Sequence, residues 1–325
     1  MKFHRRDFMY LTAGAVTVAS ASRIAGAGIY PARPIRLIVG FVPGGPTDIM
    51  GRLIAQWLSE RLGQSVVVEN RPGAASNIGA EVVVRAAPDG YTLFMANISN
   101  AVNATLYNKL PFDFVRDLVA VAGFVRVPYV MEVNPNVPAR TVAEFIAYAK
   151  SNSGKVSFAS AGTGTGMHMS GELFKLMTGV EMLHVPYRGS APALTDLMAG
   201  RTQVMFDSIP SSIAYVRSGK LRALAVTTPA RLEALPDVPT VADTVPGYDV
   251  SGWFGLVAPR GTPPDVVEKL NRETNAVLGD PNVRARLVEL GATVLPLSPA
   301  AFGTLIADET EKWAKVVKFA GISAD

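Results

Sequence analysis

Residues 34–48 read Pro-Ile-Arg-Leu-Ile-Val-Gly-Phe-Val-Pro-Gly-Gly-Pro-Thr-Asp, and this stretch decides the fold. A short apolar run ends at a glycine-rich turn, after which Pro46 suits the first turn of a helix, where no N–H donor is needed. Residues 155–166, Lys-Val-Ser-Phe-Ala-Ser-Ala-Gly-Thr-Gly-Thr-Gly, repeat the pattern. Because the first N–H groups of a helix are unpaired and carry about +0.5 charge, each turn is suited to bind an anion.

The elements around the two turns are expected to match as well. Apolar runs predict three strands in each half, at 35–41, 65–69 and 91–96 and then at 156–160, 182–186 and 203–206. Helical spacing predicts helices between them, at 46–62, 78–87, 166–177 and 191–198. Two βαβαβ units of this kind indicate an α/β fold with doubly wound parallel sheets, whose ligand sites lie at the carboxyl ends of strands.

Two extended segments, 127–133 and 250–258, separate these units from the rest of the chain. They predict two domains joined by a two-strand hinge. Domain 1 comprises residues 28–128 plus 250–325, and domain 2 comprises residues 129–249. Such a hinge permits closure around a ligand.

Residues 1–27 have the pattern of a twin-arginine export signal. Arg5-Arg6-Asp7-Phe8-Met9 precedes a short apolar stretch, and Ala25-Gly26-Ala27 provides small residues for a cleavage site. The pattern predicts a periplasmic protein. The alternative is a buried or anchoring N-terminal helix.

The composition excludes several classes of function. Of 31 Lys and Arg residues and 27 Asp and Glu residues, the first 27 positions contain four and one, so the remainder carries a net charge of only +1 (27 minus 26). Without a clustered basic face, a nucleic-acid partner is not expected. The chain has no cysteine, which excludes disulfides and thiol chemistry. Beyond residue 27 only His168 and His184 remain, with no adjacent carboxylate cluster, so we expect neither metal nor cofactor.

Enzymatic signatures are missing too. Residues 162–166, Gly-Thr-Gly-Thr-Gly, fail the dinucleotide fingerprint because Met167 stands where the third glycine belongs, and no P-loop lysine follows. No Gly-x-Ser-x-Gly nucleophile elbow occurs either. A binding function without bond chemistry is therefore expected.

Seven motifs, in order from about residue 30 to the C-terminus, carry a family resemblance. They are Tyr30–Asp48, Val68-Glu-Asn-Arg-Pro-Gly73, Pro88-Asp-Gly-Tyr-Thr-Leu93, Ala161–Glu172, His184-Val-Pro-Tyr-Arg-Gly189, Leu235-Pro-Asp-Val-Pro-Thr240 and Ala258-Pro-Arg-Gly-Thr-Pro263. With these motifs the chain resembles the Bug family, the solute-binding proteins of tripartite tricarboxylate transport. The resemblance implies a type II periplasmic-binding-protein fold, a monomer that works with the transporter's membrane subunits, and a small carboxylated ligand. That ligand would be a di- or tricarboxylate, an acidic amino acid, or an aromatic or amide relative.

The resemblance also implies the ligand-binding residues. In such proteins the first turn of each domain holds the ligand carboxylate, partly through water. The corresponding positions here are Phe41, Pro43, Gly44, Gly45 and Thr47, opposite Gly162, Thr163, Gly164 and Thr165, with His168, Tyr187 and Asp207 as further lining residues. Residues 97–100, Asn-Ile-Ser-Asn, occupy a site that varies within the family, so they leave the ligand's identity open.

Ser99 and Asn100 are candidate polar residues for selecting the ligand. Three other side chains each have two possible roles. His168 either donates to the ligand or packs locally. Asp207 either caps the next helix or pairs with an ammonium or hydroxyl group of the ligand. Arg188 either clamps a second carboxylate or lies on the surface.

We therefore expect a protein that captures a small carboxylate in an interdomain cleft for a tripartite tricarboxylate transporter. A ligand-sensing subunit of a signalling receptor and an exported hydrolase are the alternatives.

Overall fold

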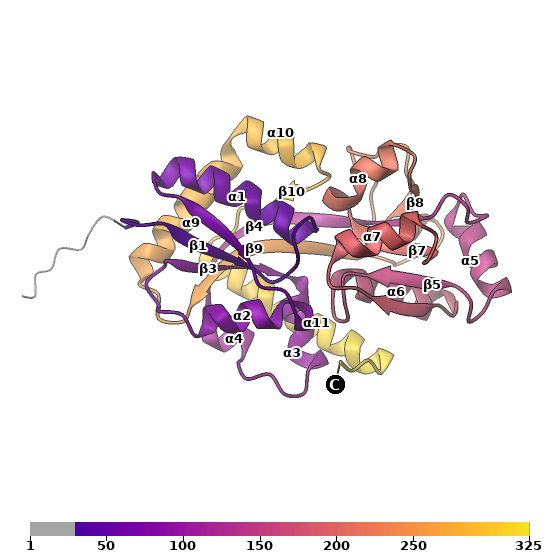
Figure 1. Ribbon diagram of the computed structural model, residues 1–325, viewed down its shortest axis with the longest axis horizontal. Helices are drawn as coiled ribbons and strands as arrows, with labels where there is room; N and C mark the ends of the chain where they lie inside the picture. Colours follow the sequence, from indigo (N-terminus) through magenta and orange to yellow (C-terminus); the bar gives the residue numbers. More distant parts are fainter. Residues whose placement is uncertain (1–29, 325) are drawn as a thin grey trace, which may run out of the picture. The chain divides into compact units, whose positions relative to one another are not determined.

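Two sets of parallel strands form the centre of the computed structural model, which describes residues 30–324 (Figure 1). The first set is β1 (Ile35–Val39), β2 (Val66–Asn70) and β3 (Thr92–Asn97), and the second is β5 (Ser157–Ser160), β6 (Leu183–Pro186) and β7 (Val204–Ser208). In each set the first strand lies between the other two, which gives the orders β2-β1-β3 and β6-β5-β7. The predicted pair of βαβαβ units is thus confirmed. The predicted export signal, residues 1–27, lies outside the described residues.

A helix follows each of these strands. In the first set these are α1 (Pro46–Leu62), α2 (Asn77–Val84, preceded by the 3-10 turn Ala74–Ser76) and α3 (Ile98–Leu106). In the second set they are α6 (Gly166–Thr178), α7 (Ser190–Met198) and α8 (Ile209–Arg217). The predicted starts of α1 and α6 are correct to the residue. No boundaries were predicted for α3 (98–106) or α8 (209–217).

The two sets are joined by β4 (Leu118–Val133), which is longer than the predicted segment 127–133. Residues 118–128 of β4 pair with β9 (Ser251–Pro259), and residues 129–133 pair with β7 and with β8 (Arg222–Val226). Pro128 stands at the change of partner, where a residue without an N–H donor is tolerated. We call β1–β3 with β9 and β10 (Thr293–Val294) the first half of the sheet, and β5–β8 the second half.

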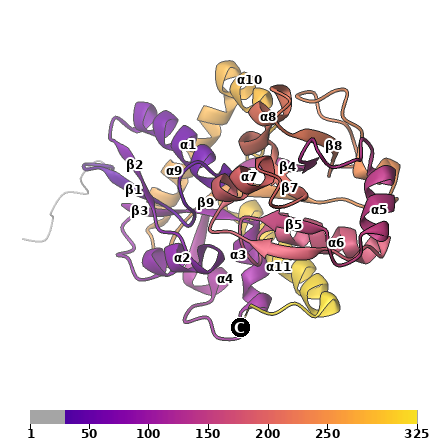
Figure 2. The same ribbon diagram turned by 45° about the vertical axis from the view of Figure 1, so that its right-hand side comes forward.

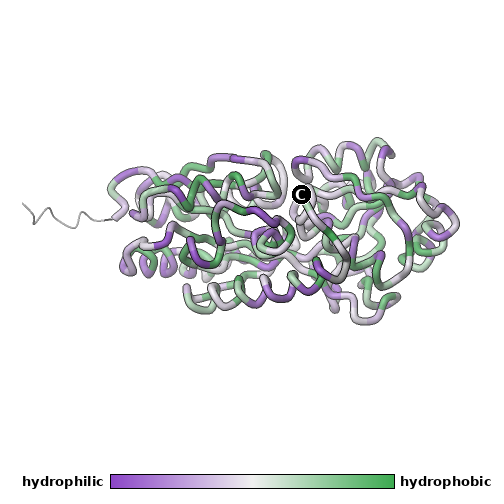
Figure 3. The backbone as a smooth tube through the Cα atoms, turned by 90° about the horizontal axis from the view of Figure 1, so that it is seen from below, coloured by the Kyte–Doolittle hydropathy of each residue, from purple (hydrophilic) through white to green (hydrophobic). Residues whose placement is uncertain are grey.

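The remaining helices lie around these halves. They are α4 (Phe114–Asp117), α5 (Val142–Ser151), the 3-10 turn Val241–Asp243, α9 (Pro264–Gly279), α10 (Pro281–Glu289) and α11 (Pro299–Ala320). Helix α11 packs on α3 and β4 and also contacts α6, so it touches both halves (Figure 2). The chain then returns to α3, where Ala324 N donates to Leu106 O at 3.2 Å, and it ends between the two halves (Figure 3).

Large apolar side chains fill the space between the sheet and its helices. Phe94 on β3, Phe158 on β5, Phe206 on β7 and Trp253 on β9 are all fully buried. Each such side chain contributes about 1.5–3 kcal/mol when it leaves water. From Arg33 onward the chain forms one compact unit, which places both glycine turns in the same body.

Candidate functional site

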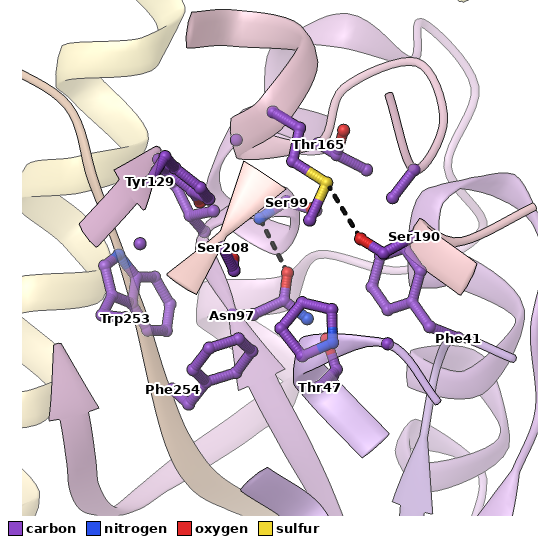
Figure 4. A pocket seen from close by; sticks show the side chains of 17 residues that line it. Phe41, Thr47, Asn97, Ser99, Tyr129, Thr165, Ser190, Ser208, Trp253 and Phe254 are labelled. Atoms are coloured by element: carbon purple, nitrogen blue, oxygen red, sulfur yellow. Dashed lines mark hydrogen bonds between the residues drawn. The ribbon is translucent and has the colours of Figure 1, made fainter. Parts of the chain in front are cut away.

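The starts of five helices converge on one pocket (Figure 4). From the first half of the sheet come Gly45, Pro46 and Thr47 at the start of α1, and Asn97, Ile98 and Ser99 at the start of α3. From the second half come Thr165, Gly166 and Met167 of α6, Ser190 of α7 and Ser208 of α8. Phe41, Tyr129, Ala161, Gly252, Trp253 and Phe254 complete the wall.

The electrostatics of this pocket favour an anion. None of the lining residues is Asp, Glu, Lys, Arg or His. Among the lining residues, the positive field therefore comes from the helix starts, each equivalent to about +0.5 charge with unpaired N–H groups. Five such ends around one space form an anion site without a single cationic side chain.

Side-chain donors add to this field. The hydroxyl groups of Thr47, Ser99, Tyr129 and Ser208 line the pocket, and no described residue accepts or donates a hydrogen bond at them. These four residues are at most 4% exposed. Their hydroxyls are therefore free to donate to a bound group.

Among the described residues that line the pocket, Asn97 has a buried hydrogen-bond donor without a partner. Its Oδ1 accepts from Ser99 N at 2.9 Å and caps α3 (dashed line in Figure 4). Its Nδ2 has no hydrogen-bond partner among the described residues, although the side chain is buried. An unpaired buried donor costs about 1–3 kcal/mol, which a ligand acceptor would recover.

The pocket is small and adjoins a larger cavity. Its volume is about 30 Å³, room for about two water molecules. The neighbouring cavity has a volume of about 290 Å³ and shares Phe41 and Ala161 with the pocket. Glycine permits the close contact between the halves here: a Cβ on Gly164 would lie 2.4 Å from Leu106 Cδ2, and one on Gly189 would lie 2.5 Å from Val42 Cγ2.

The structure brings together eight of the thirteen residues predicted for the site. Phe41, Gly45, Thr47, Ser99 and Thr165 line the pocket, and Phe41, Gly162, Thr163 and Tyr187 line the larger cavity together with Arg188. Arg188 is exposed, and the Tyr187 hydroxyl donates to Asp196 Oδ2 at 2.7 Å. Pro43, Gly44, Gly164, His168 and Asp207 line neither space.

Gly44 and Pro43 lie at the exposed outer edge of the first turn. Gly44 N donates to Asp48 Oδ2 at 3.0 Å, so this amide is already used within the turn. Asp48 also accepts from Arg52 and Asn70. Burial opposes ionisation of Asp48, but these hydrogen bonds outweigh it and hold its pKa below the usual value. Asp48 thus stabilises the turn through its hydrogen bond with Gly44 N and does not line the pocket.

His168 is engaged locally. Gly164 N donates to its Nδ1 at 3.2 Å, and its Nε2 lies 3.6 Å from Glu172 Oε1. Its ring stacks on His184 with 3.9 Å between centroids. Burial lowers the pKa of His184 to about 3, and its Nε2 lies 2.6 Å from Ser160 Oγ. These contacts correspond to the packing alternative for His168.

Asp207 lies behind the pocket wall. It is 0% exposed on β7 and accepts hydrogen bonds from Ser190, Ser211 and Ser212. Sequence reasoning did not select Asn97, Tyr129, Ser190, Ser208, Trp253 or Phe254 as site residues. The signal that could have found Ser190 and Ser208 is their position immediately before a predicted or implied helix in the second unit, which matches the place of Thr165.

Two structural features are absent from the described residues. No group of three or more His, Asp or Glu residues is placed to hold a metal ion. Within residues 30–324, every helix is too short or too polar to cross a membrane.

Comparison with known proteins identifies the family. A family model described as the tripartite tricarboxylate transporter family receptor (TctC) matches residues 50–322. Protein BugT of Bordetella pertussis (strain Tohama I) is 38% identical over 309 residues, which cover 94% of this chain and 95% of BugT. The structure of R. palustris Rpa4515 with adipate is similar with a TM-score of 0.89 and 40% identity, covering 90% of this chain and 99% of that one.

A third relative supports the fold. The periplasmic binding protein BugD is similar with a TM-score of 0.87 and 35% identity, covering 90% of this chain and 99% of that one. The predicted periplasmic-binding-protein fold is confirmed by these likenesses. The chain belongs to the TctC family of tripartite tricarboxylate transporter receptors, the solute-binding proteins that include the Bug proteins.

Proposed function

We propose that this protein captures a small carboxylate in the pocket at the five helix starts and delivers it to the membrane subunits of a tripartite tricarboxylate transporter. The single observation that carries the proposal is that pocket, which concentrates positive potential but contains no charged side chain. The carboxylate contacts the starts of α1 and α3 on one side and those of α6, α7 and α8 on the other. Family membership and the adipate in Rpa4515 support the same class of ligand.

The protein acts in the periplasm, after export by the twin-arginine signal at residues 1–27, and binds as a monomer without chemical turnover. The family, whose relatives include a periplasmic binding protein, supports this location. Among the predicted site residues, Phe41, Gly45 and Thr47 lie on one side of the proposed ligand space, and Gly162, Thr163 and Thr165 lie on the other. The side chains of Thr47, Asn97 and Ser99 supply hydrogen-bond donors to the carboxylate.

Ligand entry requires the halves to part. The pocket lies between the two halves and has room for about two water molecules, so we take the present arrangement as the closed cleft. The hinge lies where β4 changes partner, at residues 128–129, and where the chain re-enters β9 at residue 251. With this hinge the proposed domains are residues 28–128 plus 250–325 and residues 129–249.

Thermal unfolding of the mature protein tests the proposal. Ligands are offered as carboxylates and as their uncharged amides at equal concentration. Binding to the folded state raises the unfolding temperature in proportion to the logarithm of saturation, so at least one carboxylate should produce a shift that its amide does not. Equal shifts by acid and amide, or no shift by any carboxylate, would refute the anion site.

Delivery needs its own measurement. Cells that produce the membrane subunits should accumulate the labelled carboxylate only when the binding protein is supplied. Uptake that is independent of the binding protein would leave capture intact but remove the transport role, in favour of a ligand-sensing subunit.

A further inference from the structure

Two carboxyl groups without a basic partner lie directly behind the pocket. Glu132 on β4 and Asp207 on β7 are both 0% exposed. Asp207 is opposite Val130 in the antiparallel ladder, which makes Glu132 its diagonal neighbour on the same face. Neither forms an ion pair with a Lys, Arg or His residue of the described chain.

Ser212 links the two groups, and its distances to them indicate that one of the two is protonated. Its Oγ lies 2.7 Å from Glu132 Oε1 and 2.8 Å from Asp207 Oδ2. A hydroxyl has one hydrogen and can donate to only one of them. The other carboxyl group must itself donate to Ser212 Oγ, and for that it must be protonated.

The surroundings place that proton on Glu132. Burial raises the pKa of Asp207 as well, but Asp207 accepts two further hydrogen bonds that oppose this rise, from Ser190 at 2.6 Å and from Ser211 at 2.5 Å. Glu132 has only Ser212, and its Oε2 has no partner among the described residues. Burial, reinforced by the charge of Asp207, raises the pKa of Glu132 well above its usual value. In the resulting series of hydrogen bonds, the protonated Glu132 donates to Ser212 Oγ, and the Ser212 hydroxyl donates to the Asp207 carboxylate.

This arrangement fixes the hydroxyl of Ser190. Ser190 Oγ lies 2.6 Å from Asp207 Oδ1 but 3.4 Å from Met167 Sδ, and a carboxylate is a much stronger acceptor than a thioether. Its hydrogen therefore points at Asp207. The oxygen lines the pocket (Figure 4) and can offer only lone pairs there.

Ser190 differs in this from the other pocket hydroxyls. Those of Thr47, Ser99, Tyr129 and Ser208 have no partner among the described residues and are free to donate. Thr165 also has its hydrogen engaged, by Gly162 O at 2.8 Å, but its oxygen accepts from His168 N at 3.3 Å, which leaves it one lone pair. Ser190 Oγ is thus the pocket hydroxyl whose hydrogen is engaged and whose two lone pairs are both unused by the described residues.

We propose that Ser190 Oγ accepts a hydrogen bond from a hydroxyl or ammonium group next to the ligand carboxylate, so that the site selects hydroxy or amino acids over unsubstituted acids. This inference rests on the proposed function. Asp207 is a positioning residue that holds the Ser190 hydroxyl. Glu132, in its neutral form, is a positioning residue that holds Ser212 on Asp207.

The test uses pairs of acids that differ by one hydroxyl group: malate and succinate, lactate and propionate, mandelate and phenylacetate. Calorimetry gives the affinity ratio within each pair that binds. The wild-type protein should prefer the hydroxy acid by about 3- to 10-fold, the value of one hydrogen bond. Ser190→Ala should bring the ratio close to one.

Three further variants separate positioning from folding. Ser99→Ala removes a donor, so it should weaken both acids of a pair alike and leave their ratio as in the wild type. Asp207→Asn releases the Ser190 hydrogen and should lower the ratio. Glu132→Ala should lower the affinity ratio as well. Glu132→Gln should keep it at the wild-type value, because the amide N–H replaces the carboxylic O–H toward Ser212.

The outcomes are distinct. Equal wild-type affinity for both acids of every pair, or an unchanged ratio in Ser190→Ala, overturns the inference and leaves carboxylate capture standing. Failure of every acid to bind overturns capture and the inference together. If the Glu132→Gln variant folds but no longer prefers the hydroxy acid, Glu132 is not the neutral donor to Ser212.

Discussion

Replacing Asn97 with Asp is the most direct test of the donor-lined pocket. Asn97 Oδ1 caps α3 by accepting from Ser99 N, while Nδ2 lines the pocket without a partner. Aspartate ranks with asparagine as an N-cap, so the cap should survive. The substitution exchanges the unused donor for a negatively charged oxygen in the pocket.

The expected loss of affinity is large. A hydrogen bond to a charged group contributes about 1.5–3 kcal/mol, and that contribution disappears. Two like charges about 4 Å apart repel by about 4 kcal/mol at an effective dielectric constant of 20. Together they exceed about 5 kcal/mol, which corresponds to a loss of more than about 1000-fold.

A graded series makes the reasoning quantitative. Asn97→Ser keeps a capping oxygen and removes the donor without adding charge, so only the first contribution is lost, about 10- to 150-fold. Asn100→Asp is the matched control. Asn100 is 2% exposed in the same turn, its Oδ1 accepts from Asn97 N at 3.0 Å, and it does not line the pocket.

Calorimetry at pH 7.5 measures the affinities, and circular dichroism with thermal unfolding checks that each variant folds. Asn97→Asp should lose the most affinity, because it both removes a pocket donor and adds a charge to the pocket. Asn97→Ser removes only the donor, and Asn100→Asp adds a charge only at a residue that does not line the pocket. A folded Asn97→Asp protein that binds the carboxylate within about tenfold of the wild type would show that the anion lies elsewhere. So would a loss in Asn100→Asp that equals the loss in Asn97→Asp.

Three further outcomes are expected. The folded state holds a proton on Glu132 that the unfolded state releases above its ordinary pKa, so stability should fall by about 1.4 kcal/mol per pH unit as the pH rises from about 5 toward the raised pKa. Glu132→Gln should remove this slope in urea unfolding between pH 5 and 8, and parallel profiles would contradict a buried neutral acid. Gly45→Ala should weaken ligand binding by about 10- to 100-fold because the added methyl group takes up space in the small pocket that Gly45 lines. The fold should tolerate it, since the φ of Gly45 is −87° and its Cβ would meet Ser190 N at an ordinary contact distance of 3.7 Å. In Gly279→Ala the new Cβ meets nothing within 4 Å, so equal effects of the two substitutions in calorimetry would be inconsistent with the pocket. Asp48→Ala should lower the free energy of unfolding by about 1–3 kcal/mol at pH 7, and by less as the pH falls through the depressed pKa of Asp48, as followed by thermal unfolding.

The strand and helix order was predictable because glycine and proline mark most of its boundaries. Pro46 begins α1, and left-handed Gly63 and Gly179 end α1 and α6, as the sequence indicates. The first nine residues of β4 were missed. Their alternation is weak, and only the pairing with β9, which lies more than 120 residues away, defines them as a strand.

The two glycine turns were predictable as the ligand region, but most of the donors were not. Asn97 becomes a candidate only when its amide is seen to cap α3 with one atom and to face the pocket with the other. Glu132 and Asp207 are 75 positions apart, and their contact depends on the register of β4 with β7. No local pattern encodes that register.

If the halves move on the proposed hinge, the distribution of donors also couples binding to closure. With the halves apart, an anion on the first half would face two helix starts, those of α1 and α3, and an anion on the second half would face three. Only the closed arrangement presents all five, so the ligand's differential affinity for the closed state shifts the equilibrium toward closure. A cationic side chain on one half would hold the anion in the open state as well and would weaken this coupling. A neutral pocket divided between two halves therefore suits a receptor that must signal occupancy by its conformation and release the ligand when it opens.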